Sequence, residues 1–341
     1  MGFRISVLIL FSIASAVSGI ALVVALAYSN SPAHGTLIVA NQADHTLLLF
    51  DPDQRVQLAK ITVGISGHEV TLSKDARFAY VPIYGNSGVG RPGSDGSTVD
   101  VVDLRRRKLT ATFDLGKPLR PHRAEFGPDG MMYLTAELGN AIDVVDPTAG
   151  KVIAEIPTGQ PQSHMLVLSP DGRRAYTANV SAGSVSVLDL SKRSLIAVIP
   201  VARMIQRISI SPDGSQIFTQ DQESPRIAVI NTASNKSTDW IDLPSIAYAS
   251  APTADGRWLL VASLQTNRLF VVDLLSHKLA RSFETPQGPS EILVRPDGAL
   301  AYVSCVKAGM IAVLDLRNWQ LQEPIMLTPG VDGLAWAPAP E

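Results

Sequence analysis

The sequence predicts an all-β fold, a seven-bladed β-propeller with four antiparallel strands in each blade. The first observation is a repeated turn motif, seen as GPDG at Gly127, SPDG at Ser169 and RPDG at Arg295. The second observation is a regular spacing of 42 residues between equivalent positions, which fall at 122, 164, 206, 248, 290 and 332. A period of about 40–50 residues with four strands per period is typical of a propeller blade.

Each repeat has the same internal plan. In residues 165–201, the segment MLVL leads into the SPDG turn, and RRAYTANV, VSVLDL and LIAVIPV follow. These segments are short and rich in β-branched residues, and Gly, Pro, Asp or Asn residues separate them. Such segments are expected to form strands joined by tight turns.

The two ends of the repeat region predict how the ring closes. Residues 35–64 supply only three strands, and Gly333–Pro338 supplies the missing innermost strand. Joining both ends in one blade leaves no open sheet edge. We therefore expect residues 35–341 to form a single domain.

The N-terminal segment is separate from the repeats. Residues 5–28 carry no charge and follow Arg4. About 20 apolar residues can span a bilayer as a helix, whereas Ala25-Leu26-Ala27 matches a signal peptidase pattern. Residues 1–28 are therefore a signal-anchor helix or a signal peptide, and residues 29–34 are a linker. Either interpretation predicts a periplasmic or extracellular protein that touches the membrane only through residues 5–28.

The composition narrows the functional classes. With 29 basic and 31 acidic residues, the chain has no excess of positive charge for nucleic-acid binding. Its single cysteine, Cys305, excludes an internal disulfide and a zinc site built from several cysteines. We expect a monomer whose partner is a small polar ligand or another protein.

One repeat position is unusually polar. It lies at the start of the first strand of each blade, which lines the channel of a propeller, so its seven side chains should ring one mouth of the channel. These residues are His68, His122, His164, Gln206, Tyr248, Ser290 and Asp332. The next position adds Glu69, Arg123, Arg207 and Glu291. An insertion of 12 residues falls within residues 84–98 on the same face, which predicts a lid or binding loop.

Three interpretations of this ring remain open. The polar side chains can form a hydrated channel lining with no further role. His68, His122 and His164 can bind a divalent metal such as Zn or Cu, because neutral imidazole suits both metals. Alternatively, Arg123 and Arg207 can help the histidines to bind a small anionic ligand.

The repeats resemble a known family. Second strands such as AYVPI, AYTAN and AYVSC, and third strands such as VSVLDL and IAVLDL, are similar to those of the YVTN-type (YncE-like) β-propeller repeat family. The resemblance covers nearly everything after residue 35. It implies the propeller fold but no single activity, because propellers host many functions. A binding or scaffold protein is the first hypothesis.

A weaker resemblance concerns the segment PHRAEFGPDGMMYLTAEL, which is similar to a segment of lactonase-type propellers. It implies a lactone hydrolase that uses His122, Arg123 and Glu137. In this hypothesis His122 or Glu137 activates water, and Arg123 stabilises the oxyanion. The order here is His-Arg where the family pattern usually has Arg-His.

A third, distant resemblance is to the d1-haem propellers of the nitrite reductase type, in which histidines at a channel mouth face the haem. It implies a cofactor-binding propeller. The sequence contains no C-x-x-C-H motif for attachment of a c-type haem.

Overall fold

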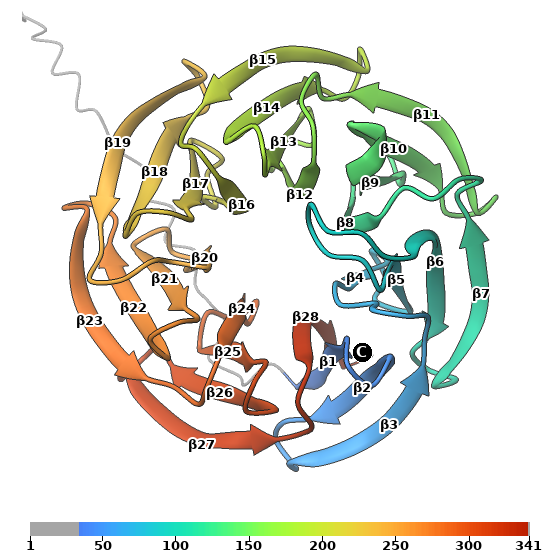
Figure 1. Ribbon diagram of the computed structural model, residues 1–341. Coiled ribbons are helices and arrows are strands. Elements are labelled where there is room, and N and C mark those ends of the chain that lie inside the picture. The colour runs from blue at the N-terminus through green and yellow to red at the C-terminus, as the bar shows by residue number, and fades with distance from the viewer. Residues whose placement is uncertain (1–33, 340–341) are drawn as a thin grey trace, which may run out of the picture. The chain divides into compact units, whose positions relative to one another are not determined.

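The computed structural model describes residues 34–339, which form seven four-stranded antiparallel sheets around a central channel (Figure 1). This confirms the predicted seven-bladed β-propeller. The predicted export segment, residues 1–28, and most of the linker lie outside the described residues. Within residues 34–339, no helix is long and apolar enough to cross a membrane.

The blades are numbered from the N-terminus, and their strands are given from the channel outwards. Blade 1 contains β28 (Val331–Pro338), β1 (Gly35–Asn41), β2 (Thr46–Asp51) and β3 (Val56–Thr62). Blade 2 contains β4 (Thr71–Leu72), β5 (Phe78–Gly85), β6 (Asp95–Asp103) and β7 (Lys108–Asp114). Blade 3 contains β8 (Pro121–Phe126), β9 (Met132–Ala136), β10 (Ala141–Asp146) and β11 (Lys151–Pro157), and a 3₁₀ turn, η1 (Glu137–Gly139), follows β9.

The other four blades repeat the plan. Blade 4 contains β12 (Ser163–Leu168), β13 (Arg174–Asn179), β14 (Ser184–Asp189) and β15 (Ser194–Pro200). Blade 5 contains β16 (Ile205–Ile210), β17 (Gln216–Asp221), β18 (Arg226–Asn231) and β19 (Lys236–Asp242). Blade 6 contains β20 (Ala249–Pro252), β21 (Trp258–Ser263), β22 (Arg268–Asp273) and β23 (Lys278–Glu284). Blade 7 contains β24 (Pro289–Val294), β25 (Leu300–Cys305), β26 (Met310–Asp315) and β27 (Gln320–Met326).

Blade 1 closes the ring, as the sequence predicts. Its innermost strand β28 pairs antiparallel with β1, with Leu37 opposite Trp336 and Val39 opposite Leu334. All four of these side chains are buried. Pairing the last strand with the first satisfies the backbone groups that each would otherwise expose at a sheet edge.

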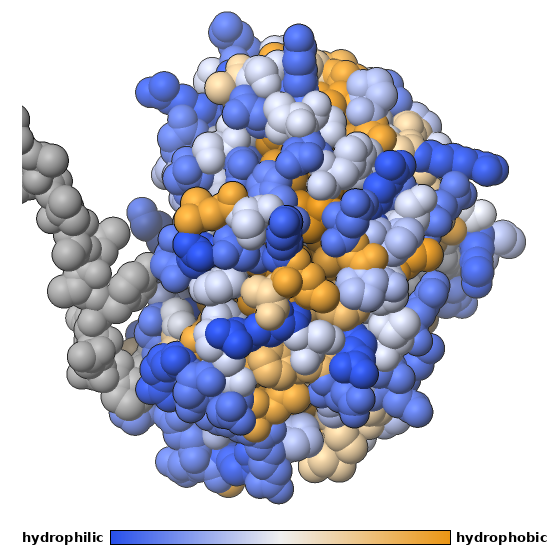
Figure 2. Space-filling view, turned by 90° about the vertical axis from the view of Figure 1, so that its left-hand side faces the viewer, coloured by the Kyte–Doolittle hydropathy of each residue, from blue (hydrophilic) through white to orange (hydrophobic). Residues whose placement is uncertain are grey.

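The apolar core lies between neighbouring blades. Leu47 and Leu49 of blade 1, for example, pack in one cluster with Val81 of blade 2. Between blades 7 and 1, Tyr302 stacks on Trp336 with ring centroids 6.0 Å apart. The outermost strands expose most of their residues, and Figure 2 shows a largely hydrophilic side of the ring with smaller hydrophobic patches. The middle strands are buried on both faces, which explains their continuous apolar runs.

The P-D-G aspartates are turn residues. In blade 4, Asp171 accepts hydrogen bonds from the Ser169 hydroxyl at 2.6 Å and from the Arg173 amide at 3.0 Å. Gly172 then adopts a φ of 64°, a left-handed conformation that glycine reaches without a steric penalty. These turns connect the first and second strands, and they lie at the channel end opposite to the ring position.

The lone cysteine is part of the core. Cys305 ends β25 and is fully buried. Burial raises the pKa of its thiol to about 12. The thiolate, which is the reactive form of cysteine, is therefore scarce at neutral pH.

Asp143 is a buried carboxylate without a hydrogen-bond partner in the described part of the chain. Asp100 occupies the same position of blade 2, but it accepts hydrogen bonds from the Gly64 amide at 2.8 Å and the Thr112 hydroxyl at 2.7 Å. In blade 3, the residue opposite Asp143 is Glu155. Burial, followed by the negative charge of Glu155, raises the pKa of Asp143 to about 7.

We predict that Asp143→Asn stabilises the protein at pH 8 by about 2–4 kcal/mol. The raised pKa means that the folded state binds the proton more tightly than the unfolded state does. Ionisation of Asp143 therefore costs stability as the pH rises from about 4 to about 7, and the amide removes that cost. Urea unfolding at pH 5 and pH 8 measures the gain, which should be larger at pH 8.

Asp100→Asn is the matched control. It replaces a carboxylate whose oxygens are both hydrogen-bonded, so it should destabilise the protein. Equal effects of the two substitutions would contradict the role assigned to the missing partners of Asp143.

Candidate functional site

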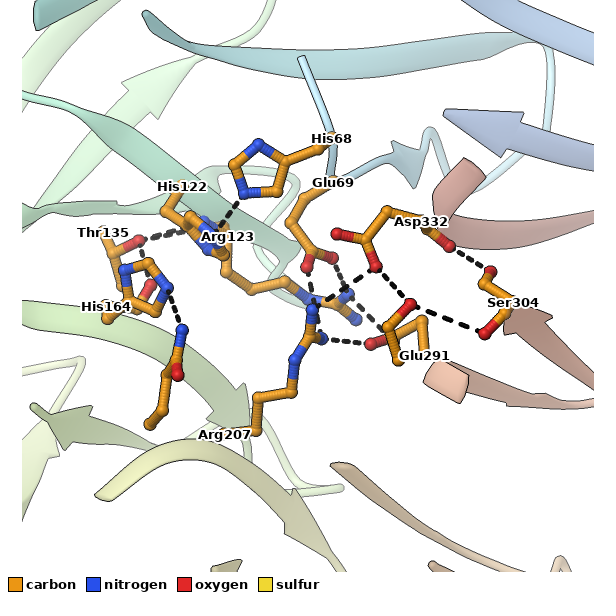
Figure 3. Close-up of polar contacts among 12 residues, drawn as sticks. His68, Glu69, His122, Arg123, Thr135, His164, Arg207, Glu291, Ser304 and Asp332 are labelled. Atoms are coloured by element: carbon orange, nitrogen blue, oxygen red, sulfur yellow. Dashed lines mark hydrogen bonds and ion pairs between the residues drawn. The ribbon is translucent and has the colours of Figure 1, made fainter. Parts of the chain in front are cut away.

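The structure brings the ring position together at one mouth of the channel (Figure 3). Four of its residues lie within the innermost strands β8, β12, β16 and β24, and Asp332 lies in β28. In blade 2 the inner strand has only two residues, so His68 and Glu69 precede β4. Tyr248 similarly comes directly before β20. The order of the blades then places side chains from distant parts of the chain in contact.

The three histidines form a row, here called the histidine file (His68, His122 and His164). The Nε2 atoms of His68 and His122 share a hydrogen bond of 2.7 Å, and the rings of His122 and His164 have centroids 3.6 Å apart. Nδ1 of His68 donates to the Ser66 carbonyl at 2.9 Å. In the neutral tautomers that fit these contacts, Nε2 of His122 donates to His68, and Nδ1 of His122 has no partner.

His122 and His164 are neutral imidazoles in this environment. Each is only 3% exposed. Burial lowers the pKa of His122 well below its usual range, and the neighbouring His164 and His68 lower it further. Burial also lowers the pKa of His164, although Glu137 partly opposes that effect. Both rings therefore keep a nitrogen lone pair at neutral pH.

Glu137 orients the end of the histidine file. It sits in the turn η1 and accepts hydrogen bonds from Nδ1 of His164 at 2.9 Å and from the Tyr84 hydroxyl at 2.7 Å. Burial raises the pKa of Glu137, but the hydrogen bonds from His164 and Tyr84 and the charge of Arg120 outweigh burial and lower it overall. The carboxylate stays ionised and holds His164 as the tautomer whose Nε2 is unprotonated.

A loop at the inserted segment is fixed near these residues. The insertion lengthens β5 and β6, and residues 86–94 between them form the cap loop. Arg120 binds this loop: its guanidinium donates to the carbonyls of Gly88 at 3.0 Å and Arg91 at 2.9 Å, and to Asp95 at 2.6 Å. The same guanidinium lies 3.4 Å from Glu137. One side chain thus links the cap loop to the carboxylate that holds His164.

Beside the histidine file lies a set of charged residues, here called the ion layer, which is shown in Figure 3. It consists of Glu69, Arg123, Arg207, Glu291 and Asp332. Glu69 pairs with Arg123 at 3.0 Å and with Arg207 at 3.3 Å. Arg207 also binds Glu291 and lies 3.6 Å from Asp332, so it reaches across the channel from blade 5 to blades 7 and 1.

The carboxylates of the ion layer differ in proton affinity. Burial opposes ionisation of Glu69, but the charges of Arg207 and Arg123 outweigh burial and lower its pKa. Burial raises the pKa of Glu291 to about 7, against the opposing charge of Arg207. The pKa of Asp332 is also raised, mainly by burial. Glu291 is therefore partly protonated near neutral pH.

The remaining ring residues complete the contacts. The Gln206 amide lies 3.4 Å from Nε2 of His164, and Arg207 lies over the ring of Tyr248 with its Cζ atom 5.0 Å from the centroid. The Ser290 hydroxyl donates to Asp332 at 2.9 Å. Every residue of the predicted ring is thus in contact with the histidine file, the ion layer, or both.

Two expectations need adjustment. The lactonase resemblance groups Glu137 with His122, but the hydrogen bond of Glu137 goes to His164, because η1 contacts β12 of the following blade. The two arginines were candidates for binding an anion. Arg123 already pairs with Glu69 and Glu125, and Arg207 pairs with Glu69 and Glu291, so the geometry does not favour an added anion.

The histidines do not have the arrangement of a metal site. Within residues 34–339, no group of three or more His, Cys, Asp or Glu side chains is placed to hold a metal ion. Nε2 of His68 and Nε2 of His122 bind each other, and Nδ1 of His164 binds Glu137. Binding of a d1-type haem stays a prediction, which the contacts within residues 34–339 do not test.

Tyr84 and Arg120 are site residues that the sequence did not reveal. Tyr84 makes edge-on ring contacts with all three histidines, at centroid distances of 5.4–6.0 Å. Arg120 adopts a φ of 51°, which is uncommon for a residue with a side chain. Their places in the sequence could have identified them as site residues. Arg120 lies two residues before His122, and Tyr84 begins the inserted segment.

Comparisons with known proteins support the fold. No protein-family model matches the chain, and no curated protein matches it in sequence. Hydrazine synthase of Kuenenia stuttgartiensis is 20% identical with a TM-score of 0.70, over 84% of this chain and 93% of that chain. The periplasmic gluconolactonase PpgL of Pseudomonas aeruginosa is 18% identical with a TM-score of 0.70, over 90% of this chain and 99% of that chain.

A third solved structure is dihydro-haem d1 dehydrogenase NirN in complex with DHE. It is 15% identical with a TM-score of 0.66, over 90% of this chain and 76% of that chain. These similarities establish a seven-bladed β-propeller, an architecture that neighbours use for different chemistries. The similarity to the YVTN-type repeat family remains a resemblance of the repeat sequences.

We predict that Arg120→Gln loosens the cap loop. The substitution removes the charge that holds Asp95, together with the donors to two loop carbonyls, so backbone amides of residues 86–94 should open more often. Hydrogen exchange should become at least about tenfold faster there, equivalent to about 1.4 kcal/mol of lost local stability. Lys117→Gln, which removes an exposed ion pair with Glu155, is the control. Unchanged exchange in Arg120→Gln would mean that other contacts hold the loop.

Proposed function

We propose that the protein is an exported, YVTN-type binding propeller that holds a small polar ligand at the channel mouth beside the cap loop. One observation carries the proposal: a single repeat position supplies polar side chains from all seven blades, and an inserted loop is fixed near them by Arg120. A channel lining needs no such loop. Export is inferred from the uncharged run of residues 5–28.

The electrostatics favour a ligand with hydroxyl or carbonyl groups over an anion. His122 and His164 are neutral, and the arginines of the ion layer already have carboxylate partners. His68, Gln206 and Tyr248 are only half-buried, so a ligand can reach them. Imidazole, amide and phenol groups can each donate or accept a hydrogen bond with a neutral partner.

Thermal unfolding with a panel of neutral sugars, polyols and lactones, each beside its carboxylate analogue, tests this proposal. A neutral compound should raise the melting temperature more than its carboxylate analogue does. His68→Ala should remove the shift, whereas His277→Ala, on the outer side of blade 6, should keep it. A panel without any shift, or a shift that survives His68→Ala, would overturn the binding proposal.

A second candidate, lactone hydrolysis, is favoured by the pair of Glu137 and His164. Glu137 fixes His164 with Nε2 unprotonated, which is the arrangement of a general base oriented by a carboxylate. Nε2 of His122 is occupied by His68, so His164 suits the role better than His122 does. The gluconolactonase neighbour supports this candidate only through the shared fold.

If the protein hydrolyses lactones, Glu137→Gln should lower kcat/KM for glucono-δ-lactone by about 100-fold or more, because an amide cannot hold His164 as the same tautomer with the same charge. A pH-indicator assay, corrected for spontaneous hydrolysis, measures the rate. Glu155→Gln, on an outer strand of blade 3, should retain the wild-type rate. Wild-type protein that fails to accelerate lactone opening would exclude this candidate and leave binding.

The pH dependence gives a separate test of the assigned base. The pKa of His164 is lowered, so the imidazole stays neutral at pH values where a free imidazole, with a pKa near 6.5, would be protonated. The corrected kcat/KM should therefore change less than about twofold between pH 6 and pH 8. A fall of about fourfold towards pH 6 would instead indicate a base with the ordinary histidine pKa.

A divalent metal, Zn or Cu, on His68, His122 and His164 stays a prediction without support from the geometry of these side chains. Elemental analysis of protein purified without chelator tests it. About one metal per chain, lost in a triple His→Ala variant, would show that the rings rearrange around an ion.

A further inference from the structure

A cavity of about 230 Å³ opens between blades 1 and 2, on the face of the ring that carries the P-D-G turns. This face lies opposite to the channel mouth, so the cavity is separate from the histidine file and the ion layer. Seven of its eleven lining residues are apolar, among them Ile38, Leu49, Leu58 and Leu104. Leu58 and Leu104 are only half-buried, so solvent reaches an apolar surface here. A concave surface with an apolar lining is typical of a ligand site.

Two differences from the other repeats leave this space open. Between blades 6 and 7, the equivalent space holds Trp258 and Trp319, whose rings pack edge to face with centroids 5.4 Å apart. The registers of β1 with β2 and of β21 with β22 place Thr36 at the position of Trp258. Arg107 holds the position of Trp319, because each lies four residues after the aspartate that ends the third strand and each has a positive φ. A threonine and an arginine thus replace two indole rings.

The rim of the cavity carries positive charge that is not paired. Arg105 and Arg107 line the cavity and are exposed. Within residues 34–339, neither guanidinium group forms an ion pair, and Arg107 uses one nitrogen to donate to the Leu58 carbonyl at 3.2 Å. Each guanidinium group has five N–H donors. An anion at this rim would therefore meet two cations with donors to spare.

The surrounding turns reinforce this charge. Asp75 is the one acidic residue in the lining, and it accepts a hydrogen bond from the Arg77 amide at 3.1 Å. The two turns of blade 2 on this face, residues 73–77 and 103–108, contain six basic and two acidic residues. The second acidic residue, Asp103, pairs with the Arg77 guanidinium at 3.4 Å. The remaining charge is positive, which favours an anionic ligand.

Two other cavities on this face have different linings. The cavity between blades 5 and 6 is lined by Asp213 and Asp255 and by no basic residue. The cavity between blades 4 and 5 is lined by two arginines, but also by Asp171 and Asp213. One of these arginines, Arg173, lies 3.8 Å from Asp171. Of the three cavities, the one between blades 1 and 2 alone combines a largely apolar lining with an excess of arginines.

We propose that this cavity binds a small carboxylate with a short apolar chain. The chain lies against Leu58 and Leu104, and the carboxylate binds the guanidinium groups of Arg105 and Arg107. The planar fork of donors on arginine matches the two oxygens of a carboxylate. The volume suits a ligand of a few heavy atoms, because drug-sized ligands need pockets of roughly 300–1,000 Å³. This site goes beyond the ligand proposed at the channel mouth and does not depend on it.

Titration of the whole chain, labelled at its leucine methyl groups, with sodium hexanoate tests the proposal by NMR. The signals of Leu58 and Leu104 should shift, whereas those of Leu274, beside the cavity between blades 5 and 6, should stay in place. Hexanoate should bind at least about tenfold more tightly than acetate, which lacks the chain, and than 1-hexanol, which lacks the charge. Unmoved signals of Leu58 and Leu104, or equal affinity for hexanoate and 1-hexanol, would overturn the proposal.

Two kinds of variant locate the site. Arg105→Gln combined with Arg107→Gln should weaken hexanoate binding at least about tenfold, because the carboxylate loses both charged partners. Arg173→Gln, in the cavity between blades 4 and 5, should leave the affinity unchanged. Thr36→Trp should abolish binding, because an indole then fills the space as Trp258 does between blades 6 and 7. It keeps the test decisive if the double arginine variant does not fold. Full hexanoate affinity in either folded variant would show that hexanoate binds elsewhere. Neither variant alters the histidine file, so the two proposals fail separately.

A further variant tests whether another part of the chain takes this place. Pro338 lines the cavity, and the described residues end at Ala339. Removal of residues 340–341 should leave the affinity for hexanoate unchanged. An affinity that rises about tenfold or more would assign the cavity to the chain's own C-terminal residues and overturn the proposal.

Discussion

Everything in this molecule depends on closing seven sheets into a ring without leaving a strand edge free. The pairing of β28 with β1 achieves this, and it also places the last ring residue, Asp332, beside the first. The amide of Gly333 donates to the His68 carbonyl at 2.8 Å, and a Cβ atom at Gly333 would lie 2.4 Å from that oxygen. A glycine is therefore required where β28 of blade 1 meets the segment before β4 of blade 2. This close contact holds Asp332 and His68, the last and first residues of the ring position, next to each other.

The channel then imposes a second constraint, because charged side chains that point into it leave bulk water. Arg207 is 4% exposed and Glu69 is 1% exposed, so each would be costly alone. They compensate each other, and burial raises the pKa values of the two further carboxylates, Glu291 and Asp332. His122 and His164 avoid a buried charge in another way, because burial lowers the pKa of each imidazole. The channel thus contains buried imidazoles and a network of ion pairs side by side.

The repeat makes the fold and the ring position predictable from the sequence, but it does not predict the contacts between blades. A spacing of 42 residues placed seven side chains at one mouth, because every blade uses the same register. The spacing does not predict contacts across the ring. The ion pair between Arg207 of blade 5 and Glu69 of blade 2 is one example. The repeat also did not predict Tyr84 or Arg120 as site residues. Tyr84 begins the inserted segment, and Arg120 binds the cap loop within it. The period also did not predict that Glu137 of blade 3 binds His164 of blade 4, because spacing along the chain carries no information on contacts between blades.

The single thiol described above has a consequence for the redox chemistry of the folded chain. Cys305 is fully buried, and its pKa of about 12 leaves almost no thiolate to attack a disulfide. The folded chain therefore neither forms mixed disulfides nor joins a second copy through sulfur. The fold of residues 34–339 therefore depends on no disulfide, and its one thiol is shielded from reducing and oxidising solvents alike.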